Sequence, residues 1–205
     1  FKKMIVFSRD EYKQELLEKS IPPSIKKKFR FFLGDIRDKN RLNLAFDDVD
    51  LVIHAAALKQ VPKAEYDPFE FINTNILGSQ NIINAALETK VKKVIALSTD
   101  KASSPANLYG ATKLCSDKLF LAANNIKGFK NISFTVLRYG NVFGSRGSIY
   151  NIIKTNPKIV KMTDNRMTRF HITLDKAVEL CLWGVKNSYG GEIIVPKLSS
   201  YKLEE

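Results

Sequence analysis

The sequence predicts an α/β protein built on a doubly wound parallel sheet. Two observations carry this prediction. Short apolar runs alternate with amphipathic stretches along most of the 205 residues, and polar residues follow directly after several of the apolar runs. Strands that alternate with helices at this spacing form a parallel sheet with helices on both faces. Because the apolar runs are continuous, we expect strands that are buried on both sides.

The expected elements alternate in chain order. Strands are expected over 4–7, 29–33, 51–54, 93–97, 132–137 and 191–195. Helices are expected over 11–19, 38–46, 69–88, 108–125 and 174–186. Asp67 and Pro68 precede the longest helix, and proline suits a first helical turn because its missing N–H would have no partner there. The last residues, 200–205, are expected to begin another helix.

Composition excludes several classes of protein. A hydrophobic content of 44% indicates a folded globular chain, and the apolar runs are too short to cross a bilayer. The net charge of +12 comes from scattered lysines, which favours a lysine-rich surface or an anionic small ligand over nucleic acid. Cys115 and Cys181 are too few for a disulfide-built fold, so a cytoplasmic setting is expected. His54 and His171 lack metal-ligand spacing, and no metal is expected.

The strongest local motif is the pair Tyr109 and Lys113, four residues apart on an expected helix. Side chains at this spacing share one helix face, and an ammonium beside a phenol lowers the pKa of the phenol. Such a phenol can act as a general acid or base near neutral pH. The pair alone is common on solvated helices. Here it follows a strand that ends in Ser98 and Thr99, and ligands of parallel sheets bind at the carboxyl ends of strands.

Several motifs together resemble the UDP-N-acetylglucosamine 4,6-dehydratases of the extended short-chain dehydrogenase/reductase superfamily, a group with inverting members. The motifs are Ser8-Arg9-Asp10-Glu11, Gly34 to Asp38, His54 to Pro62, Asn73-Thr74-Asn75, Leu97 to Ala102, Asn107 to Lys113, Arg138 to Val142 and Met167 to Phe170. The resemblance covers residues 8–196. The triplet Thr99-Asp100-Lys101 is its most specific part.

The resemblance implies five catalytic residues for an NADP-dependent dehydration of UDP-N-acetylglucosamine. Tyr109 would take the proton of the sugar C4 hydroxyl, with Lys113 lowering its pKa and holding the nicotinamide ribose. Thr99 would hydrogen-bond the C4 oxygen. Asp100 would be the acid at C6, and Lys101 the base at C5. A lysine base that returns its proton to the opposite face would invert C5.

The resemblance also implies residues that bind the cofactor and the UDP-sugar. The expected cofactor contacts are Ser8, Arg9, Asp35, Ile36, Ala55, Lys59, Ser98, Lys113 and Val142. The expected substrate contacts are Tyr109, Asn141 and Arg169. Arg9 can pair with a 2′-phosphate, which favours NADP over NAD. The alternatives are that Arg9 is a turn residue bonded to Asp10, and that Arg169 is a solvated surface arginine.

The sequence departs from the family pattern at its beginning. The glycine-rich loop and the first strand of the family are missing, so we expect an internal segment of a longer, homo-oligomeric protein. That first strand lies between the second and the fourth, so two strand edges should be unpaired. We expect a truncated dinucleotide-binding domain over 1–146 and a partial substrate lobe over 147–205. Two other functions stay open, a UDP-sugar 4-epimerase and a non-catalytic nucleotide-binding fragment.

Overall fold

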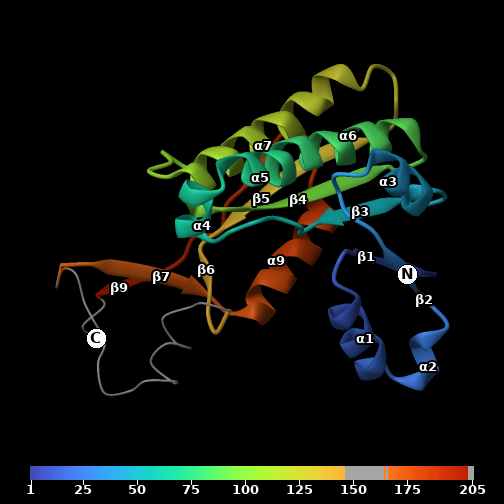
Figure 1. Cartoon of the computed structure of the whole chain (residues 1–205), viewed down its shortest axis with the longest axis horizontal. Coiled ribbons are helices and arrows are strands. Elements are labelled where there is room, and N and C mark those ends of the chain that lie inside the picture. Colours follow the sequence, from blue (N-terminus) through green and yellow to red (C-terminus); the bar gives the residue numbers. More distant parts are fainter. Residues whose placement is uncertain (146–163, 165, 203–205) are drawn as a thin grey trace.

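The computed structural model describes residues 1–145, 164 and 166–202 (Figure 1). The strands are β1 (Met4–Ser8), β2 (Phe29–Leu33), β3 (Leu51–His54), β4 (Lys93–Thr99), β5 (Ser133–Tyr139), β6 (Asn141–Val142), β7 (Thr168–Ile172), β8 (Ile193–Ile194) and β9 (Ser200–Lys202). The α-helices are α1 (Glu11–Ser20), α2 (Pro23–Lys26), α3 (Lys39–Phe46), α4 (Val61–Tyr66), α5 (Pro68–Phe71), α6 (Gly78–Glu88), α7 (Leu108–Ile126) and α9 (Leu174–Asn187). A π-helix (Ile72–Leu77) joins α5 to α6, and a 3₁₀ turn (Asp100–Ala102) follows β4. No helix in these ranges is long and apolar enough to cross a membrane.

The parallel sheet is divided into two parts. One has the strand order β3-β4-β5-β8, and the other contains β1 and β2. Within the described ranges, β1 pairs only with β2, and β3 pairs only with β4. The expected pair of unpaired strand edges is therefore confirmed.

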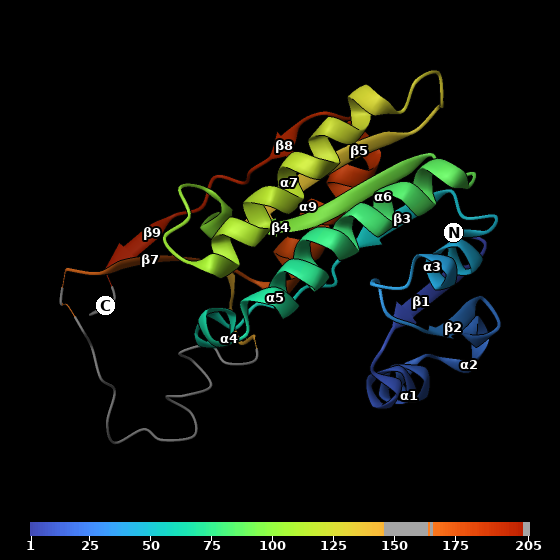
Figure 2. The same ribbon diagram turned by 45° about the horizontal axis from the view of Figure 1, so that its top comes forward.

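Helices cover both faces of the four-stranded sheet (Figures 1 and 2). Phe134 and Val136 of β5 pack in one core cluster with Phe120 of α7. Leu137, the next residue of β5, packs instead with Cys181 of α9. Because successive strand residues point to opposite faces, one strand serves both cores. The layered α/β architecture is as expected.

Burial differs between the strands. Val94 and Ile95 of β4 are fully buried, whereas Leu51 and Ile53 of β3 are 36% and 45% exposed. The expectation of burial on both sides is thus right for β4 and wrong for β3. The reason is that β3 lies at the edge of the sheet among the described residues, while α9 packs against β4 and β5.

The C-terminal region contains strands that the sequence did not predict. β6 pairs with β7 in parallel, and β9 pairs with β7 in antiparallel orientation. The expectation of a helix beginning at Ser200 is wrong, because this segment pairs with β7 and Tyr201 stacks on His171. The expected domain boundary between residues 146 and 147 lies outside the described residues, and the division into two domains stays a prediction.

Candidate active site

The carboxyl end of β4 places three polar residues in one turn. Thr99 ends the strand, and its side chain caps the 3₁₀ turn by accepting a hydrogen bond from the Lys101 N–H. The Thr99 hydroxyl donates to Asp100 Oδ1 over 2.9 Å, and Lys101 Nζ donates to the same oxygen over 3.1 Å. One carboxylate oxygen therefore binds both a hydroxyl and an ammonium, and both charged side chains remain partly exposed to solvent.

Asn141 joins this group from a different strand. Lys101 Nζ donates to Asn141 Oδ1 over 3.0 Å, and Asn141 begins β6, two residues after the end of β5. The carboxyl ends of adjacent parallel strands meet at one edge of a sheet. The ammonium of Lys101 is thus held between groups from two strand ends.

Tyr109 reaches the same turn from the first residues of α7. Asn107 caps this helix by accepting the Gly110 N–H over 2.9 Å. Gly110 lies so close to the carbonyl oxygen of Lys101 that a Cβ at this position would overlap it. This close approach places the side chains of Thr99 and Asp100 near enough to the Tyr109 hydroxyl to shift its pKa. The sequence-predicted residues Thr99, Asp100, Lys101 and Tyr109 therefore lie together.

The pKa of Tyr109 corrects one expectation. Burial raises this pKa, and the nearby Asp100 carboxylate adds to the rise, while the hydrogen bond with Thr99 offsets part of it. The expected lowering by Lys113 is not found. Lys113 Nζ instead donates to the Leu97 carbonyl oxygen over 2.9 Å, which directs the ammonium toward the backbone of β4.

Lys113 and Asp117 continue the face of α7 that carries Tyr109. Burial lowers the pKa of Lys113, and the carboxylate of Asp117 opposes this shift. Asp117 is 1% exposed and accepts a hydrogen bond from Arg138 Nε over 2.7 Å. Sequence reasoning missed this buried ion pair, because its two members are 21 residues apart and lie on different elements.

Asn75 connects the loop after β3 to α7. Its Oδ1 accepts the Leu58 N–H over 2.8 Å, and its Nδ2 donates to the Leu58 carbonyl oxygen over 2.9 Å and to Thr112 Oγ1 over 3.1 Å. Asn75 lies in the π-helix Ile72–Leu77, and such single-turn π segments often occur at functional sites. The expected single helix over 69–88 is thus interrupted where it supports the site.

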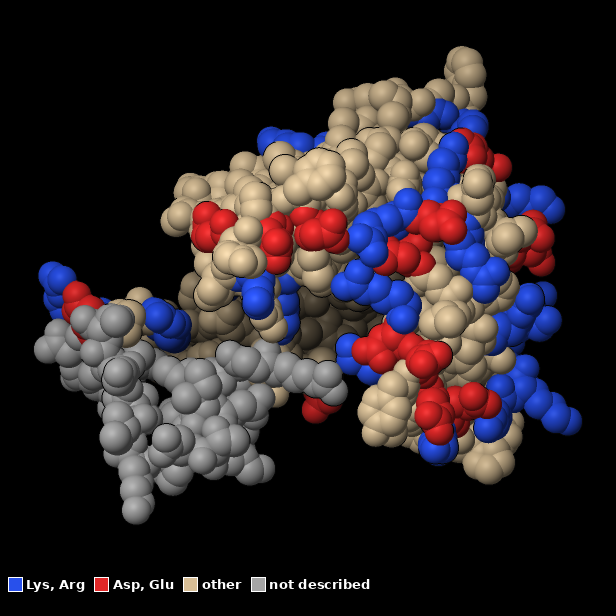
Figure 3. Space-filling model, viewed as in Figure 1, with Lys and Arg blue, Asp and Glu red and all other residues tan. Residues whose placement is uncertain are grey.

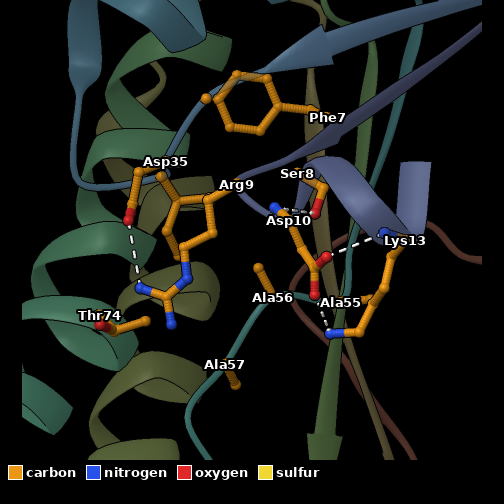
Figure 4. Close-up of a pocket in the computed structure, with 12 residues that line it drawn as sticks. Phe7, Ser8, Arg9, Asp10, Lys13, Asp35, Ala55, Ala56, Ala57 and Thr74 are labelled. Atoms are coloured by element: carbon orange, nitrogen blue, oxygen red, sulfur yellow. Dashed lines mark hydrogen bonds and ion pairs between the residues drawn. The ribbon is translucent and has the colours of Figure 1, made fainter. Parts of the chain in front are cut away.

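A cavity of about 420 Å³ lies at the carboxyl ends of β1, β2 and β3 (Figure 4). Five of the expected cofactor contacts line it, namely Ser8, Arg9, Asp35, Ile36 and Ala55. Lys13 and Thr74, which the sequence analysis did not propose as contacts, line it as well. Thr74 Oγ1 is buried without a hydrogen-bond partner in the part of the chain that the structure describes. A cavity with basic side chains and an unused hydroxyl suits a phosphate-bearing ligand.

Arg9 is anchored beside this cavity. Its Nη1 lies 3.3 Å from Asp35 Oδ2, and Asp35 also accepts from Arg37 over 2.8 Å (Figure 4 shows the Arg9 contact). Burial alone would raise the pKa of Asp35, but the two arginines outweigh it and lower that pKa. Asp10, the alternative partner of Arg9, caps α1 and forms an ion pair with Lys13.

A second cavity, of about 540 Å³, is lined by Asp100 and by residues at the ends of β5 and β8. Its walls combine the polar Arg138 and Lys197 with the apolar Phe170 and Val195. A mixed lining of this kind suits an anionic organic ligand. On the face shown in Figure 3, the molecule is hollowed near its centre, and both positive and negative side chains stand along the rim.

Four other predicted contacts lie as follows. Ser98 is buried, and its hydroxyl has no partner among the described residues. Lys59 is exposed, and Val142 pairs with Ile172. Arg169 is partly buried and donates to the Thr168 carbonyl oxygen over 2.8 Å. The binding roles of these residues stay predictions.

Within the described ranges, no three His, Cys, Asp or Glu residues form a group that could hold a metal ion.

Comparison with known proteins places this arrangement in a family. A protein-family profile described as "Polysaccharide biosynthesis protein" matches residues 1–205. The chain belongs to this family. It is also 54% identical over 205 residues to a UDP-N-acetylglucosamine 4,6-dehydratase (inverting) of Campylobacter jejuni subsp. jejuni serotype O:23/36 (strain 81-176). The alignment covers 98% of this chain but 60% of the relative, so the chain spans less than two thirds of that protein.

Solved structures support the same placement. The chain is similar to Pen from Bacillus thuringiensis, with a TM-score of 0.92 and 44% identity, over 98% of this chain and 63% of that one. DesIV, a dTDP-glucose 4,6-dehydratase from Streptomyces venezuelae, shares the fold with a TM-score of 0.85 at 21% identity, over 99% of this chain and 69% of that one. The Rossmann-like fold of the extended short-chain dehydrogenase/reductases and the resemblance to the inverting dehydratases are thereby confirmed.

Proposed function

We propose that this chain carries the catalytic residues of an NADP-dependent UDP-N-acetylglucosamine 4,6-dehydratase, a carbon–oxygen lyase that inverts C5. The product would be a UDP-4-keto-6-deoxy sugar for polysaccharide or glycan biosynthesis. One observation carries this proposal. Asp100 and Lys101 are hydrogen-bonded in one turn, directly beside Thr99 and Tyr109. Removal of water across C5 and C6 requires a base and an acid on neighbouring carbons, and adjacent residues of one turn can supply both.

Three side chains of the site would each carry out one of the proton transfers. Tyr109 takes the proton of the C4 hydroxyl, and the resulting C4 ketone acidifies the proton on C5. Lys101 first passes its ammonium proton to Asp100, to which it is hydrogen-bonded. The neutral amine then removes the C5 proton, and the protonated Asp100 gives its proton to the departing C6 hydroxyl. A nicotinamide held by Lys113 would supply the hydride chemistry, from C4 and back to C6. Lys101 then returns a proton to C5 from the opposite face.

The first cavity is the proposed place of NADP. Ser8 and Arg9 would bind the adenosine 2′-phosphate, since a guanidinium matches phosphate geometry. Asp35 and Ile36 would meet the adenine, and Ala55 leaves room for close approach to the backbone of β3. The buried, unpartnered hydroxyl of Thr74 supports a polar ligand in this cavity.

The second cavity is the proposed place of the UDP-sugar. It adjoins Asp100, and its arginine and lysine suit a diphosphate. Asn141 and Arg169 would contribute further contacts.

Both cysteines, Cys115 and Cys181, are free thiols, which supports a reducing cytoplasmic setting.

The test is a mass measurement on UDP-N-acetylglucosamine incubated with the full-length protein and NADP. Loss of one water from the sugar is expected. An unchanged mass with an inverted C4 would establish an epimerase and overturn the proposal. Lys101→Ala should retain formation of reduced nicotinamide but release no water, whereas Tyr109→Phe should do neither. Full turnover by Lys101→Ala would remove the C5-base assignment.

A further inference from the structure

Four charged side chains form a chain of ion pairs beside the first cavity. Arg9 Nη1 lies 3.3 Å from Asp35 Oδ2 (Figure 4), and Arg37 Nη2 donates to the same oxygen over 2.8 Å. Arg37 Nη1 also donates to Glu70 Oε2 over 3.0 Å. Arg9 and Asp35 line the cavity, whereas Arg37 and Glu70 do not. Asp35 is therefore shared between two arginines, one that lines the cavity and one that does not.

The two arginines hold Asp35 unequally. Arg37 contacts both carboxylate oxygens, because its backbone N–H also donates to Asp35 Oδ1 over 3.0 Å. Within the described part of the chain, the ion pair of Arg9 is the longer contact, and the Arg9 side chain is 53% exposed. Short hydrogen bonds between ionised groups are the strong ones. Arg37 is thus the main partner of this carboxylate, and Arg9 is the weakly held one.

Two helices fix Arg37 in this position. Glu70 belongs to α5 and binds the guanidinium. Asn81 of α6 donates to the carbonyl oxygens of Ile36 and Arg37 over 3.1 and 3.0 Å, which anchors the loop between β2 and α3. Because both Nη atoms of Arg37 already bind a carboxylate, Arg37 would have to give up these contacts to reach a ligand in the cavity. Arg9 would give up one longer contact.

We propose that Arg37 is a positioning residue that sets the preference for NADP: it occupies the Asp35 carboxylate and so leaves the Arg9 guanidinium available to an adenosine 2′-phosphate. Without Arg37, Asp35 could accept two hydrogen bonds from Arg9, in the bidentate arrangement that guanidinium and carboxylate favour. A phosphate would then have to compete with that carboxylate for the same guanidinium. This inference rests on the NADP part of the proposed function, and it adds a residue that acts without touching the phosphate.

Lys39 provides a matched control for the loss of charge. It lies two residues after Arg37, at the start of α3, and its side chain is 39% exposed, against 40% for Arg37. Lys39 Nζ pairs with Glu88 over 2.6 Å, and Lys39 does not line the cavity. Lys39→Gln therefore removes one positive charge from the same part of the surface and leaves the partners of Asp35 in place.

The experiment compares Arg37→Gln, Arg37→Lys and Lys39→Gln in the full-length protein. Calorimetric titration with NADP and with NAD measures two dissociation constants for each variant. We expect Arg37→Gln to weaken NADP binding about tenfold and NAD binding less than about twofold, since coupled members of one ion-pair network typically show effects of the larger size. Arg37→Lys should keep most of the preference, because lysine still supplies a cation to Asp35. Lys39→Gln should leave the ratio of the two affinities as in the wild type.

A double-mutant cycle tests whether Arg37 acts through Arg9. In the Arg9→Ala protein the guanidinium is gone, so adding Arg37→Gln should no longer change the ratio of the NADP and NAD affinities. A merely structural role for Arg37 would lower both affinities together, so the ratio separates the two roles. NAD binding and the thermal midpoint check that each variant is folded, and Arg37→Met replaces Arg37→Gln if the glutamine variant does not fold.

The results that would overturn the role of Arg37 are specific. Equal losses of NADP and NAD affinity in Arg37→Gln would do so, and so would an unchanged ratio. A ratio that still changes when Arg37→Gln is added to Arg9→Ala would show that Arg37 does not act through Arg9. If the wild type itself binds NAD as tightly as NADP, the cofactor assignment of the proposed function fails, and this inference with it. The wild-type ratio alone therefore distinguishes that failure from a failure of Arg37.

Discussion

Arg138 Nε donates to Asp117 Oδ2 over 2.7 Å, and this contact ties the end of β5 to the middle of α7. The two side chains are 15% and 1% exposed. The pair holds the strand end that leads to Asn141 against the helix that carries Tyr109 and Lys113. It therefore fixes the relative position of the two halves of the proposed site.

Asp117→Asn should strongly destabilise the fold. The change leaves the guanidinium of Arg138 largely buried without its counter-charge, and loss of one partner of a buried pair typically costs about 3–5 kcal/mol. Urea unfolding measures this cost. Asp50→Asn is the matched control, because Asp50 pairs with Lys92 on the surface over 2.7 Å, and the change should have no measurable effect. Equal effects of the two variants would contradict the buried role of Asp117.

Gly110→Ala should damage the site more than the rest of the fold. A Cβ at Gly110 would overlap the Lys101 carbonyl oxygen, so α7 must move away from the 3₁₀ turn, and Tyr109 must move with it. A displacement of this kind can cost about 100-fold in rate. The measurement is turnover together with the thermal midpoint. Gly184→Ala is the control, because its Cβ would approach a side-chain methyl group of Leu137 at 3.3 Å and would not overlap a backbone atom. Normal turnover by Gly110→Ala would show that this close approach is dispensable.

Arg9→Ala should weaken NADP binding more than NAD binding. Loss of a charged hydrogen bond to a phosphate costs about 1.5–3 kcal/mol, or roughly tenfold to 150-fold in affinity. Calorimetric titration of the full-length protein with both dinucleotides measures the difference. Arg30→Ala provides the comparison, because Arg30 stacks over the Phe32 ring at 5.3 Å and does not line the cavity. An equal loss of both affinities would remove Arg9 from the 2′-phosphate site.

Acid should destabilise the protein through His54. This side chain is 4% exposed and lies 5.5 Å from the Phe120 ring, and burial together with the Lys113 charge lowers its pKa to about 3. The unfolded chain, with a histidine pKa near ~6.5, binds more protons between these values. Stability is therefore complete above about pH 6.5 and falls as the pH drops toward 3, by up to about 1.4 kcal/mol per pH unit.

Urea unfolding at several pH values should show this slope in the wild type and a smaller one in His54→Gln. Glutamine keeps a polar side chain but does not titrate. An identical slope in both proteins would mean that other groups cause the acid sensitivity, and that His54 is not the buried neutral histidine described here.

Much of the fold was predictable because its signals are local. Continuous apolar runs marked β4 and β5, and the amphipathic stretch over 108–125 marked α7. Strands β6, β7 and β9 were missed because they are short and form through pairing between distant segments, such as Asn141 with His171. The direction of the Tyr109 pKa shift was predicted wrongly, because spacing along a helix does not reveal how deeply the phenol is buried.

By itself, the sequence determined the alternation of strands and helices, the family, and the identity of the residues at the end of β4. Only the tertiary structure decided that Thr99 bonds Asp100 near Tyr109, that Lys113 faces a backbone carbonyl, and that Asp117 pairs with Arg138. The physical reason is that the two kinds of information come from residues at different separations along the chain. Hydrophobic periodicity acts between residues close in sequence, whereas hydrogen bonds and burial depend on which distant segments the packed sheet brings together.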